Sequence, residues 1–142
     1  MARQTQRRVI ELAPLDGSRD ISFETKNLSD QIKEAHAWIS DHYHVPQPKT
    51  QVADGQLSAR GIWLDGIFIL AAAEKGGQKE PVILLSRKPR SQIVFVLFHE
   101  FWHYREYLRT GILPNFIALN FPDEAKADRS ARLDLRAYSM RP

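Results

Sequence analysis

The sequence predicts a single α+β domain in which a small antiparallel sheet packs against helices. Three short apolar segments separated by glycine-containing breaks predict strands at residues 61–64, 67–70 and 81–85. Longer segments with apolar residues at helical spacing predict helices before and after these strands. With 142 residues, 43% hydrophobic and 26% charged, the chain is large enough for one hydrophobic core. We therefore expect one domain over residues 1–142.

The N-terminal third is expected to consist of an arm and one amphipathic helix. Residues 1–27 have weak periodicity and include Pro14 and Gly17, so they predict an irregular arm. A helix is expected from about residue 30 to residue 44, with Ser29 as its N-cap and its end at Val45–Pro46. Its predicted buried stripe consists of Leu28, Ile32, Ala35, Ile39 and Tyr43.

The strands are predicted to form a three-stranded antiparallel sheet that begins near Leu57. Pro46, Pro48 and Gly55 predict a linker before it. Asp65–Gly66 predicts a two-residue hairpin with positive φ at both positions, and Gly76–Gly77 predicts the second break. Three strands are the minimum that presents one stable apolar face to a helix.

Two helices are expected to follow the sheet. The β-branched run in residues 93–98 also suits a strand, but the length of the segment through Arg109 favours a buried helix over about 91–109. A last helix is expected over about 122–138, because Pro122 lies near its start and acidic residues occupy its first turn.

The first of these helices carries the motif His-Glu-Phe-Trp-His at residues 99–103. On a helix, His99 and His103 lie one turn apart on the same face, so both imidazoles can bind one ion while Glu100 stands beside it. This is the pattern of a zinc hydrolase, in which the glutamate is the general base.

The alternative interpretation is a chance match with two structural histidines on a helix surface. Buried polar groups without partners cost about 1–3 kcal/mol each, so an apolar helix has little reason to carry two His and a Glu. A metal ion would satisfy all three side chains. His36, His42 and His44 lie on or near the first helix and are expected to be surface or hydrogen-bonded histidines.

The sequence around the motif narrows the choice of third ligand. A metzincin would carry Gly and His where this chain has Glu106 and Arg109, so that class is excluded. Glu124 and Asp128 share one face of the last helix, and either can be the ligand while the other accepts a hydrogen bond from a ligating histidine. The alternative is an ordinary solvated helix with acids near its start.

Residues 99–103, the gap of about twenty residues, and Glu124-Ala-Lys-Ala-Asp128-x-x-Ala131 resemble the ImmA/IrrE-type zinc metallopeptidases of the gluzincin group. The resemblance covers roughly residues 80–135. It implies a minimal zincin in which His99, His103 and Glu124 bind one zinc ion per chain, Glu100 is the base and Asp128 is the outer partner. This chain departs from the family pattern in having Trp102 where glycine is usual and in lacking Leu-Leu-Met-Pro after the second motif.

The resemblance implies a peptidase, with limited cleavage of a DNA-binding regulator as the expected reaction. The tetrahedral oxyanion needs a donor, for which Tyr104, Tyr107 and Tyr138 remain alternatives. Two other functions remain open: a zinc-stabilised, non-catalytic protein-binding domain (a pseudoenzyme) and a basic nucleic-acid-binding module.

Composition bears on location and partners. The chain has no cysteine, which excludes disulfides and cysteine-based zinc sites and fits a reducing cytoplasm. It has no apolar run of membrane-spanning length and no signal-peptide pattern, so we expect no membrane partner and a cytoplasmic location. The net charge of +3 is scattered along the chain, so a nucleic-acid partner is not expected.

Overall fold

The computed structural model describes residues 9–11, 26–59, 61–72, 78–87, 89–113 and 121–142 of the chain. Within these residues the fold is mixed α+β, as predicted, with three helices and six short strands. The helices are α1 (Lys26–Tyr43), α2 (Ile93–Thr110) and α3 (Phe121–Ser139). The strands are β1 (Val9–Glu11), β2 (Lys49–Val52), β3 (Gln56–Ala59), β4 (Ile62–Leu64), β5 (Gly66–Ala72) and β6 (Lys79–Leu85).

The strands form two mixed sheets, so the prediction of one three-stranded antiparallel sheet was wrong. One sheet has the order β2-β6-β5 and the other has the order β1-β3-β4. In the first sheet β5 runs antiparallel to β6, as predicted, but β2 runs parallel to β6. In the second sheet β1 runs parallel and β4 antiparallel to β3. The predicted linker after Pro48 therefore contains a strand, and part of the predicted N-terminal arm is a strand as well.

The predicted hairpin at Asp65–Gly66 was also wrong, because the chain crosses there from one sheet to the other. Gly66 begins β5 and lacks the positive φ that such a turn requires, whereas Gly61 has φ +79° beside the antiparallel pair β3–β4. A Cβ atom on Gly66 would lie 2.8 Å from Cγ1 of Val96. Glycine is therefore required at this position for close packing of β5 against α2 rather than for a turn. The predicted break at Gly76–Gly77 lies outside the described residues.

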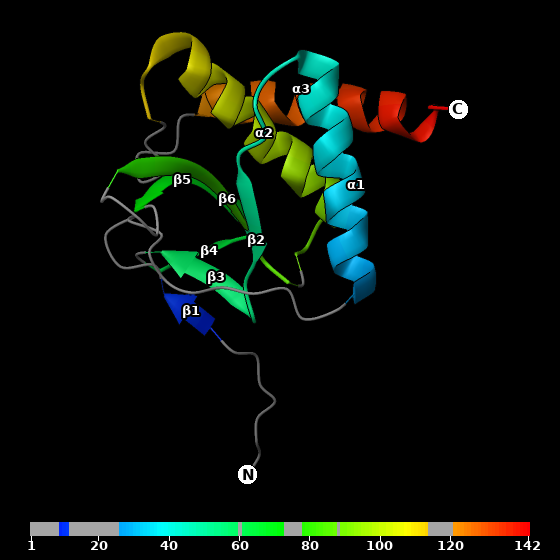
Figure 1. Ribbon diagram of the computed structural model, residues 1–142. Coiled ribbons are helices and arrows are strands. Elements are labelled where there is room, and N and C mark those ends of the chain that lie inside the picture. Colours follow the sequence, from blue (N-terminus) through cyan, green and yellow to red (C-terminus); the bar gives the residue numbers. More distant parts are fainter. Residues whose placement is uncertain (1–8, 12–25, 60, 73–77, 88, 114–120) are drawn as a thin grey trace.

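The β2-β6-β5 sheet forms the middle layer of the molecule. Alternate residues along its strands point to opposite faces. Val52, Phe68, Ile83 and Leu85 pack in the core beneath the helices. A second core lies on the other face of this sheet, formed by Ala53, Leu57, Ile67, Ile69, Ala71, Val82 and Leu84. In Figure 1 the helices α2 and α3 accordingly lie above β5 and β6, and the β1-β3-β4 sheet lies below them.

The apolar stripe of helix α1 is buried, as predicted. Its residues Ile32, Ala35 and Ile39 are fully buried, and Leu28 and Tyr43 pack on the same core. The helix begins at Lys26, so Ser29 lies inside it rather than at its N-cap. It ends just before His44, which has a left-handed φ of 55°.

Helices α2 and α3 agree closely with the sequence prediction. The β-branched run at the start of α2 is helical, and the helix ends at Gly111, whose left-handed φ of 73° lets its N–H donate to the carbonyl of Tyr107. Asp123 and Glu124 occupy the first turn of α3, as expected. None of the described helices has the length and apolar character needed to cross a bilayer.

Candidate metal centre

The two histidines of the 99–103 motif lie on the side of α2 that faces α3. This face is largely enclosed: the side chain of His99 is 13% exposed and that of His103 is 8% exposed. The imidazole rings of His99 and His103 are T-shaped with centroids 5.2 Å apart, as their separation by one helical turn dictates. The two imidazole rings therefore lie next to each other on the face of α2 that meets α3.

Helix α3 supplies the carboxylates that these rings meet. Nε2 of His99 lies 2.9 Å from Oε1 of Glu124, and Nε2 of His103 lies 2.8 Å from Oε2 of the same residue. The side chains of Ala127 and Ala131, which follow Glu124 at nearly helical spacing, are fully buried. Because these two side chains are small, α3 can pack closely on α2 and bring Glu124 within reach of both imidazoles.

Asp128, one turn further along α3, contacts the other nitrogen of His99. Its Oδ1 lies 2.7 Å from Nδ1 of that ring. A ring whose Nδ1–H donates to a carboxylate presents Nε2 toward Glu124 in a fixed orientation. The sequence did not decide which of the two carboxylates is the third ligand. In the structure Glu124 contacts both histidines, whereas Asp128 contacts only Nδ1 of His99. Glu106 instead accepts hydrogen bonds from Arg109, so it lies apart from this group.

His99, His103 and Glu124 form a group that could hold a metal ion. Their ligand atoms all lie within 4.8 Å of one another. Tetrahedral zinc with bonds of about 2.0–2.1 Å places its ligands roughly 3.3 Å apart. The two His–Glu124 separations of 2.9 Å and 2.8 Å are close to this spacing. Two imidazole nitrogens and one carboxylate also leave a fourth position open, as catalytic sites do.

Hydrogen bonds and ion pairs connect the side chains of this group. Burial lowers the pKa of His99, but the hydrogen bond to Glu124 and the neighbouring carboxylate charges outweigh it and raise this pKa to about 9. His103 follows the same pattern, and its pKa is also raised. Burial raises the pKa of Glu124, but the hydrogen bonds from His103 and His99 dominate and lower it to about 2. The carboxylate of Glu124 therefore favours the protonated form of both rings.

Glu100 lies beside the three ligands. Oε2 of Glu100 is 3.9 Å from Nε2 of His99, and the backbone N–H of Phe68 on β5 donates to its carboxylate. Burial raises the pKa of this carboxyl group, and the charges of His99 and His103 oppose the shift without cancelling it. A carboxylate with a raised pKa, next to a metal group and fixed by a backbone donor, is suited to accept and return a proton.

A cleft of about 200 Å³ opens along these residues. His99, Glu100, Glu124 and Asp128 line one part of it, and the remaining lining consists of Trp63, Leu64, Asp65, Gly66, Arg90, Ser91, Phe95 and Val96. A cleft of this kind beside perturbed titratable groups is the default place for a substrate.

The tyrosines considered as oxyanion donors lie elsewhere. The hydroxyl group of Tyr104 donates to the carbonyl of Pro46 at 2.6 Å, and Tyr138 packs against Trp38 and Phe98. Tyr107 packs against Phe68, and none of the three lines the cleft.

Sequence reasoning missed Trp63, Asp65 and Arg90 as residues of the cleft. Their spacing in the sequence does not connect them to the metal group. Trp63 and Asp65 reach the cleft through the crossover between the sheets, and Arg90 reaches it through the segment before α2. Trp102 packs edge-on against His103 with centroids 5.3 Å apart.

The histidines outside the motif have ordinary partners. Burial lowers the pKa of His36 to about 4, and a ring nitrogen of this residue lies 3.3 Å from the hydroxyl of Thr50. His42 stacks on Trp38 at 4.7 Å. These contacts are those of surface or hydrogen-bonded histidines.

No protein-family model, no curated protein and no solved structure matches this chain. The arrangement of the side chains therefore carries the functional argument.

Proposed function

We propose that this protein is a zinc-dependent peptidase of the ImmA/IrrE type. The observation that carries the proposal is the convergence of two imidazole Nε2 atoms on the two oxygens of Glu124, with the buried Glu100 alongside. This donor set suits zinc, and a glutamate one residue after the first histidine is the position that water activation requires.

His99, His103 and Glu124 would hold one zinc ion per chain, and zinc so bound supplies Lewis acidity that makes water a nucleophile near neutral pH. Glu100 accepts the proton of the attacking water and delivers it to the leaving amine, for which its raised pKa is suited. Asp128 keeps the ring of His99 oriented through Nδ1. The backbone N–H of Phe68 keeps Glu100 in place.

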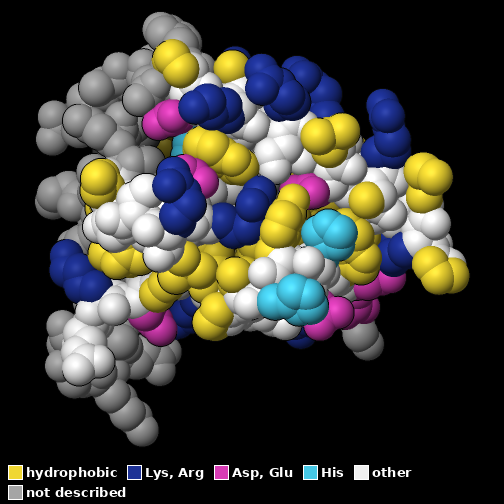
Figure 2. All heavy atoms as spheres, turned by 90° about the horizontal axis from the view of Figure 1, so that it is seen from above, with side chains coloured by type: hydrophobic (Ala, Val, Ile, Leu, Met, Phe, Trp, Pro, Cys, Tyr) yellow, Lys and Arg dark blue, Asp and Glu magenta, His cyan; other side chains and the backbone are white. Residues whose placement is uncertain are grey.

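We infer a protein or peptide as the substrate class. The resemblance to ImmA/IrrE-type peptidases favours limited cleavage of a DNA-binding regulator in the cytoplasm. A nucleic-acid ligand is less favoured, because on the face shown in Figure 2 the Lys and Arg side chains are interspersed with hydrophobic and acidic ones. A pseudoenzyme would need the three ligands but has no use for the buried carboxylate of Glu100.

The test combines metal analysis with a cleavage screen. Protein purified without added zinc should contain about one zinc ion per chain by elemental analysis. It should cleave members of a peptide library, and a chelator should abolish the cleavage. If the protein does not bind zinc in the micromolar range, the proposed metal centre is excluded. If it binds zinc but cleaves no peptide or protein, the pseudoenzyme is favoured.

Glu100→Gln is the matched control for catalysis. This substitution keeps the size of the side chain and its ability to hydrogen-bond but removes the base. We expect it to retain zinc and to lose hydrolysis by about 100-fold or more. Unchanged turnover would exclude Glu100 from the mechanism.

A further inference from the structure

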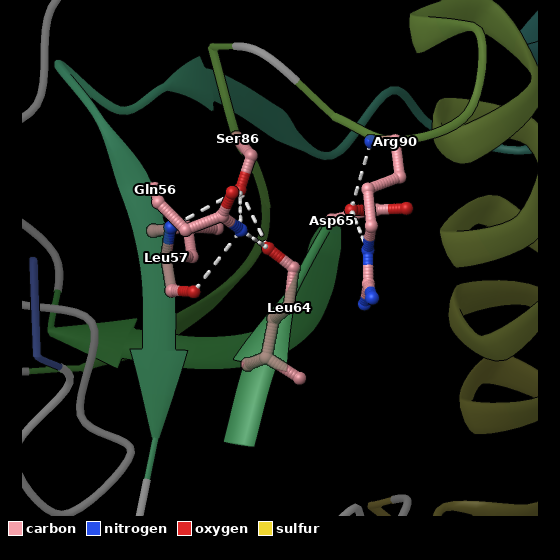
Figure 3. Close-up of polar contacts among 6 residues, drawn as sticks. All are labelled: Gln56, Leu57, Leu64, Asp65, Ser86 and Arg90. Atoms are coloured by element: carbon pink, nitrogen blue, oxygen red, sulfur yellow. Dashed lines mark hydrogen bonds and ion pairs between the residues drawn. The ribbon is translucent and has the colours of Figure 1, made fainter. Parts of the chain in front are cut away.

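The wall of the cleft opposite α3 is formed by the crossover between the two sheets. The carbonyl of Leu64 accepts hydrogen bonds from Nε2 of Gln56 at 2.7 Å and from the hydroxyl of Ser86 at 2.6 Å. The next carbonyl, that of Asp65, accepts from the backbone N–H of Ser86 at 2.7 Å. Ser86 is fully buried and also accepts from the backbone N–H of Leu57. Figure 3 shows this network, which fixes the backbone of the wall.

Asp65 in turn positions Arg90. Its Oδ1 accepts a hydrogen bond from the backbone N–H of Arg90 at 3.1 Å and lies 3.7 Å from Nε of the same residue. The side chain of Asp65 is 22% exposed, whereas that of Arg90 is 76% exposed. Figure 3 shows the arginine side chain running past Asp65 with its terminal nitrogens beyond the carboxylate. The ion pair therefore holds the arginine by its Nε and leaves the outer edge of the guanidinium in solvent.

The charges around the cleft are distributed unevenly. Arg90 is the one Lys or Arg among the described residues that line it and is paired with Asp65, while the acids Glu124 and Asp128 lie on the α3 side. Glu124 and Glu100 are engaged at the metal group. The α3 side of the cleft therefore repels a second anion, while on the other side the charge of Asp65 is balanced by Arg90, whose outer N–H groups can still donate to one.

Apolar surface lies next to Arg90. Trp63 on β4 is 49% exposed although it is a large aromatic residue, and Phe95 on α2 is half-buried. Both line the same cleft. An exposed indole at the wall of a cleft offers a flat apolar surface for a ligand side chain.

From these contacts we propose that Arg90 and Trp63 form a specificity subsite for peptides that carry an acidic side chain next to an apolar one. The guanidinium binds the carboxylate through its outer N–H groups, since a planar fork matches a carboxylate in two-point geometry. Trp63 and Phe95 contact the apolar side chain. The proposal rests on the proposed function in taking a peptide as the ligand, and it adds which peptides are selected.

Binding should be measured with zinc-loaded Glu100→Gln protein, so that hydrolysis does not consume the ligand. The probes are fluorescently labelled alanine-based peptides with one Phe and a neighbouring Glu, Gln or Lys. We expect the Glu peptide to bind about 2–5-fold more tightly than the Gln peptide, the range for an exposed ion pair. The Lys peptide should bind most weakly.

Arg90→Ala in the same background should abolish the preference for Glu over Gln without changing the zinc content. Arg136→Ala removes an exposed cation from α3 that does not line the cleft, so it should keep the preference. Trp63→Ala should weaken all peptides that contain Phe. Equal affinities for the Glu and Gln peptides, a preference that survives Arg90→Ala, or no binding of any peptide would each overturn the subsite.

This outcome is separable from that of the proposed function. If wild-type protein hydrolyses peptides without regard to acidic residues, the subsite fails and the peptidase stands. If the Glu100→Gln protein binds acidic peptides through Arg90 but the wild-type protein hydrolyses none, the subsite stands and the peptidase fails.

Discussion

Oδ1 of Asp128 lies 2.7 Å from Nδ1 of His99, on the side of the ring opposite Glu124. The ring is thus held between two carboxylates that are one turn apart on α3. Only one of them, Glu124, also reaches His103. The two acids therefore have different roles in the proposed metal site: Glu124 would complete the set of three ligands, and Asp128 would orient the ring of His99.

Substitutions at these two acids should separate the tasks. Glu124→Ala removes a ligand, so we expect it to abolish zinc binding. Asp128→Ala leaves three ligands but frees the ring, so zinc affinity should fall by about 10–100-fold, the usual effect of losing an outer partner. Competition with a chromogenic chelator would measure both affinities.

Glu106→Ala is the control, because Glu106 is an acid on α2 that pairs with Arg109 instead of the histidines. This variant should bind zinc as the wild-type protein does. If Glu106→Ala empties the site while Glu124→Ala does not, the ligand assignment and the family resemblance fail together.

The folding stability of the zinc-free protein should depend on pH, because the neighbouring carboxylates raise the pKa of His99. A histidine pKa raised from 6.5 to about 9 stabilises the folded state fully below pH 6.5, and this stability is lost as the pH rises through 9. Denaturant unfolding with chelator present should therefore show stability falling between pH 6.5 and 9, by up to about 3 kcal/mol.

Zinc should reverse this trend, because it displaces the proton from His99. Its apparent affinity should rise roughly tenfold per pH unit up to about pH 9, for each proton displaced. If the stability of the zinc-free protein is flat over this window, the hydrogen-bonded arrangement of the metal-free site is wrong.

Gly66→Ala should destabilise the protein by about 1–3 kcal/mol, as overpacking does in a well-packed core. The added Cβ would lie 2.8 Å from Cγ1 of Val96, 3.1 Å from the carbonyl oxygen of Leu84 and 3.2 Å from Cγ of Glu100. Because one of these neighbours is the proposed base, hydrolysis should fall more than zinc content does. Thermal unfolding and zinc analysis on the same sample would test this.

The double variant Gly66→Ala/Val96→Ala removes the closest of the three contacts. It should be less destabilised than the sum of the two single variants, since the second substitution makes room for the first. Additive losses would show that Gly66 does not limit the approach of α2 to β5.

The two histidines of the candidate metal centre could be predicted to lie together because their relationship is local. Residues 99 and 103 share a face of any helix, so the motif needs only the prediction of the helix itself. The position of Glu124 depends on how closely α3 packs on α2, which local spacing does not encode. The resemblance to a known family, rather than spacing, favoured Glu124 over Asp128.

The errors in the sheet have an equally specific cause. Lys49 pairs with Val82 across a parallel ladder, and nothing in the short segment Lys49–Val52 indicates a partner 33 residues away. Asp65–Gly66 has the local signature of a hairpin. The sequence alone does not distinguish a glycine that is needed for a turn from one that is needed for close packing. Trp63 and Asp65 reach the cleft only because of this crossover, so no sequence pattern could place them there.

A buried polar cluster joins all three helices. Asp134 on α3 is 4% exposed, and its Oδ1 accepts a 2.6 Å hydrogen bond from the hydroxyl of Tyr43 on α1. Ser130, one turn earlier on α3, lies 3.4 Å from Oδ2 of Asp134 and accepts from Arg105 of α2 at 3.0 Å. The guanidinium of Arg105 stacks on the ring of Tyr43 at 3.7 Å.

Asp134→Ala should therefore leave the hydroxyl groups of Tyr43 and Ser130 without this acceptor, and we expect a loss of about 1–3 kcal/mol in the free energy of unfolding. Asp134→Asn keeps an acceptor for Tyr43 and should lose less, while Leu133→Ala, an adjacent substitution at an exposed position, should have little effect. Because the cluster fixes α3 against α2, the Asp134→Ala protein should also bind zinc more weakly, although no zinc ligand has been changed. Urea unfolding of the zinc-free proteins and chelator competition of the folded ones would measure the two effects separately. A loss of stability below about 0.5 kcal/mol, the range of ordinary surface substitutions, would show that the cluster does not hold the helices together.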